Sequence, residues 1–367
     1  MVELFESVPN FSEGRRREVG DELIRAARRA RFLDADADPD HNRCVISIAG
    51  TREKIIEALV ASTAVAAERI DLRTHEGVHP RLGAADVIPI IPLGKSTLDA
   101  CREVAREVGQ RIWDELSIPV FFYGHGEGRR LADIRSGRVA PDVGGPKLHP
   151  TAGAVSVGAR PFLVAFNVML YGYDLVAARA LAKSVRESGN GLRGVQALAF
   201  QLSDDRVQLS MNLFRLEETT PSDVMAELER RGVSTGAQQI VGLCPGFAAN
   251  EAAAGRVLEG RLAAAAAARG AQRCEEIGDE EHRALARRLH QAGGALLHLA
   301  VDQDAILAAA EQTAALIPVL AAGGALDDET ETYLRVAAMG LRDAVTPATR
   351  GIYQSRAEAL DARLALG

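Results

Sequence analysis

The sequence predicts an α+β protein with two mixed α/β modules and a small helical C-terminal appendage. Strand-like and helix-like patterns follow the order β-α-β-β-α-β within residues 1–125, and the same order recurs from residue 160. That order is typical of a split βαβ, ferredoxin-like module, so we expect two such modules that face each other across a cleft. After residue 250 the sequence changes to alanine-rich amphipathic patterns, which predict helices alone.

The first module is predicted from two kinds of pattern. Its strand candidates are apolar runs bounded by turn residues, at residues 2–8, 31–38, 43–50, 87–93 and 119–124. Its helix candidates repeat apolar residues at i, i+3 and i+4, at residues 13–30, 52–70 and 96–115. The last helix and strand extend the split βαβ order by one α-β pair.

The second module is predicted in the same way. Its strand candidates are residues 161–170, 194–202, 207–216 and 238–245, and its helix candidates are residues 175–188 and 222–232. The stretch 126–159 is rich in Gly and Pro, so it is the expected joint and a candidate lining of the cleft. The predicted domains are therefore residues 1–158, 159–250 and 251–367.

Composition restricts the class of protein. The 43 basic and 50 acidic residues give a net charge of −7, which argues against a nucleic-acid partner. The four cysteines are scattered without a C-x-x-C pair, as is usual in a reducing compartment. The N-terminus lacks the pattern of a signal peptide, and no run reaches the roughly 18 apolar residues of a membrane span. We therefore expect a cytoplasmic protein without a membrane partner.

The most distinctive motif is HEGVHPRLGAAD at residues 75–86. Its first five residues fit the H-E-x-x-H pattern of zinc peptidases, which requires both histidines on one face of a helix. Gly77 interrupts the motif, and Pro80 disfavours a helical conformation of His79. We therefore predict a loop between a helix and a strand, without a metal. Its imidazole, carboxylate and guanidinium groups suit acid–base chemistry.

Several segments resemble the formiminotransferase family in chain order. They are SVPNFSEGR (7–15), DADADPDHNR (34–43), HEGVHPRLGAADVIPIIPL (75–93) and VGARPFLVAFNVML (157–170), followed by GVQALAF and QQIVGLCP. The resemblance covers about residues 3–246. It implies a folate enzyme of histidine breakdown, which transfers the formimino group of N-formimino-L-glutamate to N5 of tetrahydrofolate, the acceptor co-substrate.

The resemblance also implies a catalytic residue. The catalytic histidine of the family directly precedes Pro-Arg and corresponds to His79. Its imidazole would take a proton from N5 and protonate the leaving nitrogen of glutamate. A carboxylate should orient this imidazole, and Asp36 is the first candidate because it lies in the other dense polar motif, at the end of a strand. Alternatively, Asp36 only caps a turn that is rich in aspartate.

The residues expected to bind the substrates lie in the matched motifs. Both substrates carry glutamate carboxylates, which arginine, lysine and amide groups bind well. The folate-contacting stretch of the family corresponds to residues 144–153, which lack the serines, phenylalanine and tryptophan of the vertebrate pattern. The candidates are Asn42, Arg43, His75, Arg81, Gly144, Gly145, Lys147 and Gly153. The cations could instead be surface charges, and the glycines could only turn the chain.

Other functions remain open at this point. A glutamate formyltransferase, or a related folate-dependent one-carbon transfer on the same fold, would differ only in the donor, which has O in place of NH. A folate-binding protein without catalysis belongs to another class, and a zinc hydrolase is the third alternative. The sequence does not separate the formimino donor from the formyl donor.

The helical region after residue 250 is about half as long as the cyclodeaminase part of the bifunctional members of the family, and it lacks the glycine-rich opening of that part. We therefore expect no independent cyclodeaminase activity. The region is assigned a packing or oligomerisation role, and we expect a homo-oligomer, in the simplest case a dimer. His282, His290 and His298 are interpreted as ordinary helix residues.

Overall fold

The computed structural model describes residues 2–78, 80–202, 204–345 and 354–365. Two compact units are present, one from Glu3 to Phe162 and one from Leu163 onward that also includes residue 2. Each unit contains both helices and a sheet, which confirms the predicted α+β class. His79, the predicted catalytic residue, lies outside the described residues.

The described residues of the Glu3–Phe162 unit form a seven-stranded sheet. Its strands are β1 (Leu4–Ser7), β2 (Asn10–Phe11), β3 (Arg31–Asp38), β4 (Arg43–Gly50), β5 (Ala85–Leu93), β6 (Val120–Gly124) and β7 (Val155–Ala159). Strands β1 and β2 each pair antiparallel with β4 on one side and with β5 on the other. They therefore lie end to end between β4 and β5. Strand β3 pairs with β4, and β7 lies parallel to both β5 and β6.

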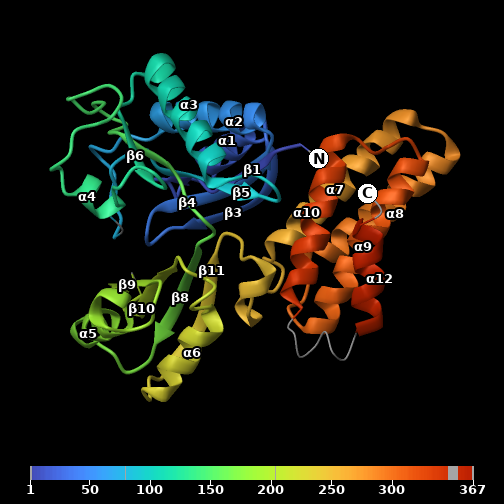
Figure 1. Cartoon of the computed structure of the whole chain (residues 1–367). Coiled ribbons are helices and arrows are strands. Elements are labelled where there is room, and N and C mark those ends of the chain that lie inside the picture. The colour runs from blue at the N-terminus through green and yellow to red at the C-terminus, as the bar shows by residue number, and fades with distance from the viewer. Residues whose placement is uncertain (1, 79, 203, 346–353, 366–367) are drawn as a thin grey trace. The chain divides into compact units, whose positions relative to one another are not determined.

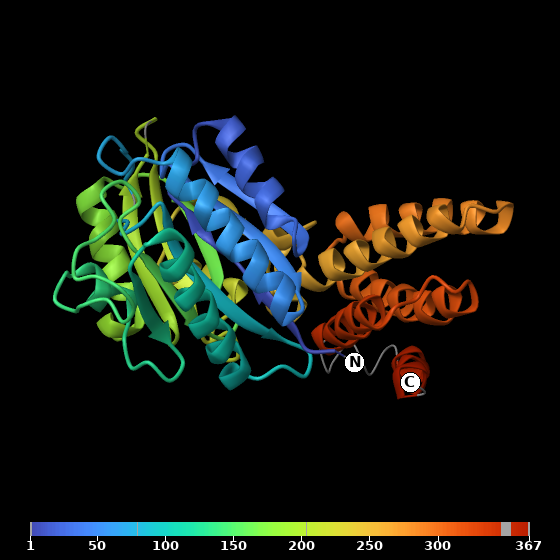
Figure 2. The same ribbon diagram turned by 90° about the horizontal axis from the view of Figure 1, so that it is seen from above.

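The helices of this unit pack against one face of its sheet. They are α1 (Arg17–Ala27), α2 (Arg52–Arg69) and α3 (Leu98–Leu116), with the short α4 (Leu131–Arg135) elsewhere. Figures 1 and 2 show α1, α2 and α3 side by side over the sheet. Leu23, Leu59 and Val104 from these helices join Ile46 and Ile88 from the sheet in one fully buried core. Removing this much apolar surface from water is the main force that holds the unit together.

The strands predicted in the first module are present as β1, β3, β4, β5 and β6. Strand β7 was not predicted, because residues 155–159 lie in the stretch that was interpreted as a joint. This short strand is held by parallel pairing with β5 and β6, so its partners are distant in sequence and give no local pattern. Accordingly, the first compact unit ends at Phe162.

The unit from Leu163 onward begins with a four-stranded antiparallel sheet in the order β11-β8-β10-β9. Its elements are β8 (Val164–Leu170), α5 (Leu175–Val185), β9 (Val195–Gln201), β10 (Val207–Leu213), α6 (Pro221–Arg230) and β11 (Thr235–Val241). Strand β9 alternates between buried and exposed residues, which is the pattern of a strand packed on one side. Helix α5 covers β9 and β10 on that side.

The same unit continues with helices. They are α7 (Leu258–Ile277), α8 (Glu280–Leu297), α9 (Gln303–Ala322), α10 (Asp328–Ala344) and α12 (Gln354–Ala365). Helix α7 packs along α8 and α10, and α9 packs along α10 (Figure 1). Side-chain carboxylates cap the starts of α8, α9 and α10, where free backbone N–H groups need acceptors.

Helix α9 is long and apolar enough, by length and composition alone, to cross a membrane. The expectation of no membrane span was based on the lack of a long uninterrupted apolar run. Helix α9 has a high mean hydropathy although polar residues interrupt its apolar sequence. Its Ile306, Leu307 and Leu320 are buried within the helical group. Its Asp304 and Glu311 accept hydrogen bonds from Arg356 of α12. These contacts are those of a helix packed in a helical group.

Glu259, near the start of α7, is a buried carboxylic acid. Its Oε2 accepts a hydrogen bond of 2.8 Å from the backbone N of Gly246. Gly340 of α10 leaves room for this side chain, since a Cβ there would lie 2.6 Å from Cγ of Glu259. Burial raises the pKa of Glu259 to about 7, and the charge of Asp343 acts in the same direction.

Replacement of Glu259 by glutamine is expected to flatten the pH dependence of stability. The pKa of about 7 in the folded chain exceeds the ordinary 4.5, so the folded state holds this proton more tightly than the unfolded state. The wild-type free energy of unfolding should therefore fall as the pH rises between these values, by on the order of 3 kcal/mol. Urea unfolding at pH 5 and pH 8 gives the free energy of unfolding of both proteins. If this free energy changed equally with pH in both proteins, the prediction would be contradicted.

Candidate active site

The loop that contains the H-P-R motif connects α2 with β5. Its described residues, 71–78 and 80–84, form no helix, as Gly77 and Pro80 predict. The zinc alternative requires a helix here, and the described part of the loop does not provide one. No group of three or more His, Cys, Asp and Glu side chains that could hold a metal ion occurs among the described residues.

Backbone hydrogen bonds hold this loop beside the stretch predicted to contact folate. Leu72 N donates to Thr151 O at 2.9 Å, and Ala84 N donates to Ala152 O at 2.9 Å. Ala154 N donates in turn to Leu82 O at 3.2 Å. The two segments are about 70 residues apart in sequence, and the fold brings them together within one compact unit.

Asn42 connects the second polar motif to the same loop. Its Nδ2 donates to Glu76 O at 2.8 Å, and its Oδ1 accepts from Gly14 N at 2.9 Å. Asn42 has a φ of +46°, a left-handed conformation that asparagine tolerates better than most residues. Both polar groups of this buried amide are therefore used to hold the turn before β4 against the loop.

Arg43 and Arg135 converge on the carboxylate of Asp86. Arg43 Nη2 and Arg135 Nη2 donate to Asp86 Oδ2 at 2.6 and 2.7 Å, and Leu82 N donates to Oδ1 at 2.6 Å. Arg43 Nη1 also donates to Pro80 O at 3.3 Å. Burial alone would raise the pKa of Asp86, but the two guanidinium groups and these hydrogen bonds hold it below its ordinary value.

His75 and Arg81 interact within the loop. Arg81 Nη1 lies 3.1 Å from His75 Nε2, and Arg81 Nη2 donates to Gly77 O at 2.8 Å. A guanidinium group can only donate, so Nε2 of His75 accepts and a neutral imidazole carries its proton on Nδ1. That Nδ1 is buried without a partner among the described residues. His75 and Arg81 are therefore hydrogen-bonded to one another within the loop.

Asp36 lies on β3 beside a small hollow. This hollow has a volume of about 230 Å³, and its lining includes Glu13, Arg15, Arg16 and Cys44. Burial, followed by the negative charge of Asp36, raises the pKa of the Cys44 thiol to about 12. Strand β3, which carries Asp36, belongs to the same sheet as β5, the strand that follows the loop.

The predicted folate stretch is largely exposed. Lys147 is exposed, and Gly144 and Gly145 lie in the same exposed turn. Gly144 has a φ of +72°, and a Cβ there would come within 2.3 Å of the Trp113 ring. Glycine at 144 is therefore required by packing against α3. Gly153, at the end of the stretch, contacts the loop directly through a bridge with Gly83.

Asp86 and Arg135 were not among the predicted site residues. Asp86 follows the H-P-R motif and directly precedes the apolar strand predicted at residues 87–93, so its buried position could have been suspected from the sequence. Arg135 has no such signal, because it lies on a five-residue helix within a Gly-rich stretch. Only the folded chain brings it to Asp86.

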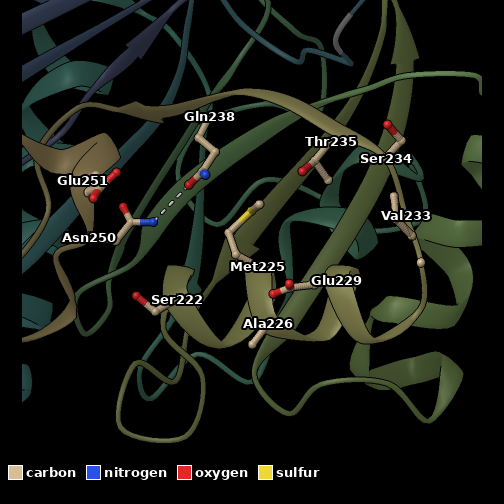
Figure 3. Close-up of a pocket in the computed structure, with 11 residues that line it drawn as sticks. Ser222, Met225, Ala226, Glu229, Val233, Ser234, Thr235, Gln238, Asn250 and Glu251 are labelled. Carbon is tan, nitrogen blue, oxygen red and sulfur yellow. Dashed lines mark hydrogen bonds between the residues drawn. The ribbon is translucent and has the colours of Figure 1, made fainter.

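A larger hollow of about 840 Å³ lies in the other unit, between α6, β11 and the segment after it (Figure 3). Its lining includes Glu229, Glu251, Gln238 and Asn250, and Asn250 Nδ2 donates to Gln238 Oε1 at 3.1 Å. Two carboxylates and no arginine or lysine belong to this lining, and none of the predicted site residues does. The hollow therefore does not suit a ligand with several carboxylates.

Comparison with known proteins first defines the class. The chain is 37% identical over 269 residues to the glutamate formimidoyltransferase of Streptococcus pyogenes serotype M1, and the matched region covers 67% of this chain and 90% of that protein. It is 38% identical over 270 residues to the protein of the same name from Thermoplasma acidophilum, with coverage of 66% and 89%. It is 36% identical over 284 residues to the formimidoyltransferase-cyclodeaminase of Rattus norvegicus, with coverage of 69% and 52%. The chain is therefore a transferase.

The family follows from the same comparison. Residues 4–160 match the N-terminal subdomain of the formiminotransferase domain. This range coincides almost completely with the first compact unit, which carries the H-P-R loop and its partners. The chain belongs to the formiminotransferase family.

Proposed function

We propose that the chain transfers the formimino group of N-formimino-L-glutamate to N5 of tetrahydrofolate, with 5-formiminotetrahydrofolate and glutamate as products. The observation that supports this proposal best is the contact between the H-P-R loop and residues 151–154. It places the two motifs that resemble the family's catalytic and folate-contacting segments next to one another, in the unit that matches the family.

In the proposed mechanism, His79 takes the proton of N5 as the nitrogen attacks the amidine carbon. A tetrahedral intermediate forms, and the C–N bond to glutamate breaks as the same imidazole protonates the leaving nitrogen. Asp36 orients the imidazole and stabilises its charged form. No step requires a metal, because a protonated amidine is already an electrophile.

The substrate carboxylates are assigned to Arg81 and Lys147, with Asn42 and His75 in support. Arg43 is already bound to Asp86 and Pro80 O, so its role is to place the loop and to supply positive charge. Gly144, Gly145 and Gly153 allow the backbone to approach a flat ligand. Arg81 retains its charge for this role, since arginine is not deprotonated in proteins.

Further properties of the fold, the helical region and the cellular location belong to the same proposal. The order β3-β4-β1/β2-β5 with α1 and α2, and the order β9-β10-β8-β11 with α5 and α6, are what two ferredoxin-like modules would give. We assign the helices from α7 onward to packing or to a homodimer. The protein is assigned to the cytoplasm, without nucleic-acid or membrane partners and without cyclodeaminase activity.

A comparison of donors tests the proposal. The purified chain is incubated with tetrahydrofolate and equal concentrations of either N-formiminoglutamate or N-formylglutamate, and the folate product is followed by its absorbance. We expect the formimino donor to react at least about tenfold faster, because a site that hydrogen-bonds the NH group discriminates against O. A faster formyl donor would assign the chain to formyl transfer. Folate binding without turnover of either donor would make it a binding protein.

A further inference from the structure

We infer that Asp86 is the positioning residue of the H-P-R loop, which it holds in place by means of two arginines and one backbone N–H group. Its side chain is 1% exposed, at the beginning of β5. A buried carboxylate is costly unless it is paired and hydrogen-bonded. The three donors that satisfy Asp86 come from three separate segments, so their arrangement depends on this one side chain.

The contacts of Asp86 lead to the residues that follow position 79. Leu82 N donates directly to Oδ1 at 2.6 Å. Pro80 O accepts from Arg43, and Arg43 is held by Asp86 Oδ2. Asp86 therefore fixes the loop at Leu82 directly and at Pro80 through one guanidinium group. The strand β5 that carries Asp86 is buried and pairs with β1, β2 and β7, so hydrogen bonds on both sides hold it in the sheet.

The charges give Asp86 a second role. Two guanidinium groups meet at one carboxylate. Burial lowers the pKa of Arg81, and the positive charge of Arg43 lowers it further, whereas the negative charge of Asp86 raises it. Loss of the Asp86 charge would leave Arg43 and Arg135 facing each other in a buried site. Repulsion would then displace the loop residues that Arg43 holds.

The inference rests on the proposed function only for its kinetic part. In Asp86→Asn, we expect kcat for formimino transfer to fall about 10- to 100-fold with a smaller change in KM, because a misplaced loop costs orientation. Independently of any substrate, hydrogen–deuterium exchange of the backbone amides of residues 81–84 should become faster, since Leu82 N and the loop lose their support. The double variant Asp86→Asn, Arg135→Gln removes one of the two repelling cations and should recover part of the lost turnover.

Asp327 provides a matched control. Its carboxylate also accepts from two arginines, Arg269 and Arg273, and from one backbone N–H group, that of Thr330. It lies at the start of α10 in the other compact unit. Asp327→Asn should therefore leave kcat and the amide exchange of residues 81–84 unchanged.

The outcomes separate the inference from the proposed function. Folded Asp86→Asn with wild-type kcat and wild-type exchange overturns the inference. If Asp86→Asn does not fold, Asp86→Glu keeps the charge but shifts the carboxylate, and normal exchange together with full turnover in that variant also overturns it. A wild-type protein without formimino transfer contradicts the proposed function, while the exchange measurement still tests Asp86.

Discussion

Replacement of His79 by glutamine is expected to lower turnover by about 10²- to 10⁴-fold while folate binding is retained. Glutamine preserves hydrogen-bonding groups but cannot move a proton at neutral pH, so the N5 proton has no acceptor and the leaving nitrogen no donor. Steady-state rates with N-formiminoglutamate and equilibrium binding of tetrahydrofolate, measured on the same preparation, check the two parts of this expectation.

His75→Gln is the control for this experiment. It makes the same change in the same loop, four residues away, at a histidine whose Nε2 accepts from Arg81. We expect a loss of turnover below about tenfold, because only support of Arg81 is weakened. Unchanged turnover in His79→Gln would remove the general base from the mechanism, and equal losses in both variants would assign the effect to the loop as a whole.

Replacement of Gly153 by alanine is expected to destabilise the first unit by about 2–5 kcal/mol and to impair turnover as well. Gly153 has a φ of +71°, which costs alanine about 1–2 kcal/mol. The added Cβ would also lie 2.2 Å from Leu82 O, a backbone atom of the H-P-R loop. Relief of this overlap requires the loop to move, at a further cost of about 1–3 kcal/mol. Urea unfolding and steady-state kinetics measure the two effects.

Gly128→Ala separates the two contributions. Gly128 has a similar φ of +64°, but a Cβ there would have no atom within 4 Å. This variant should lose only the conformational part, about 1–2 kcal/mol, with turnover unchanged. Equal effects of the two substitutions would show that the close approach of Gly153 to Leu82 has no consequence.

The predicted loop illustrates how far local sequence can be read. Gly77 and Pro80 exclude a regular helix for reasons that act within one or two residues, so the loop was predictable without any tertiary information. The strands β3, β4 and β5 and the helices α1 to α3 were predictable for the same reason, since their periodicity is local. The position of His79 in this loop was available from the motif alone.

The strand β7 and the partners of Asp86 show where such prediction ends. Residues 155–159 become a strand because β5 and β6 provide parallel partners, from 69 and 35 residues away in sequence. Asp86 ends the HEGVHPRLGAAD motif, but its two arginines come from β4 and α4. Neither the parallel pairing of β7 nor the contacts of Asp86 with its arginines produces a periodic pattern in the sequence.

The sequence by itself determined the α+β class, most of the regular elements, the loop and the resemblance of its motif, because each depends on neighbouring residues or on a short run of letters. The tertiary structure decided which distant segments meet: residues 151–154 beside the loop, Asn42 against Glu76, and two arginines on Asp86. It also decided that Glu259 is buried, which raises its pKa to about 7. These properties depend on burial and on contacts across many residues, and both arise only when the chain is folded.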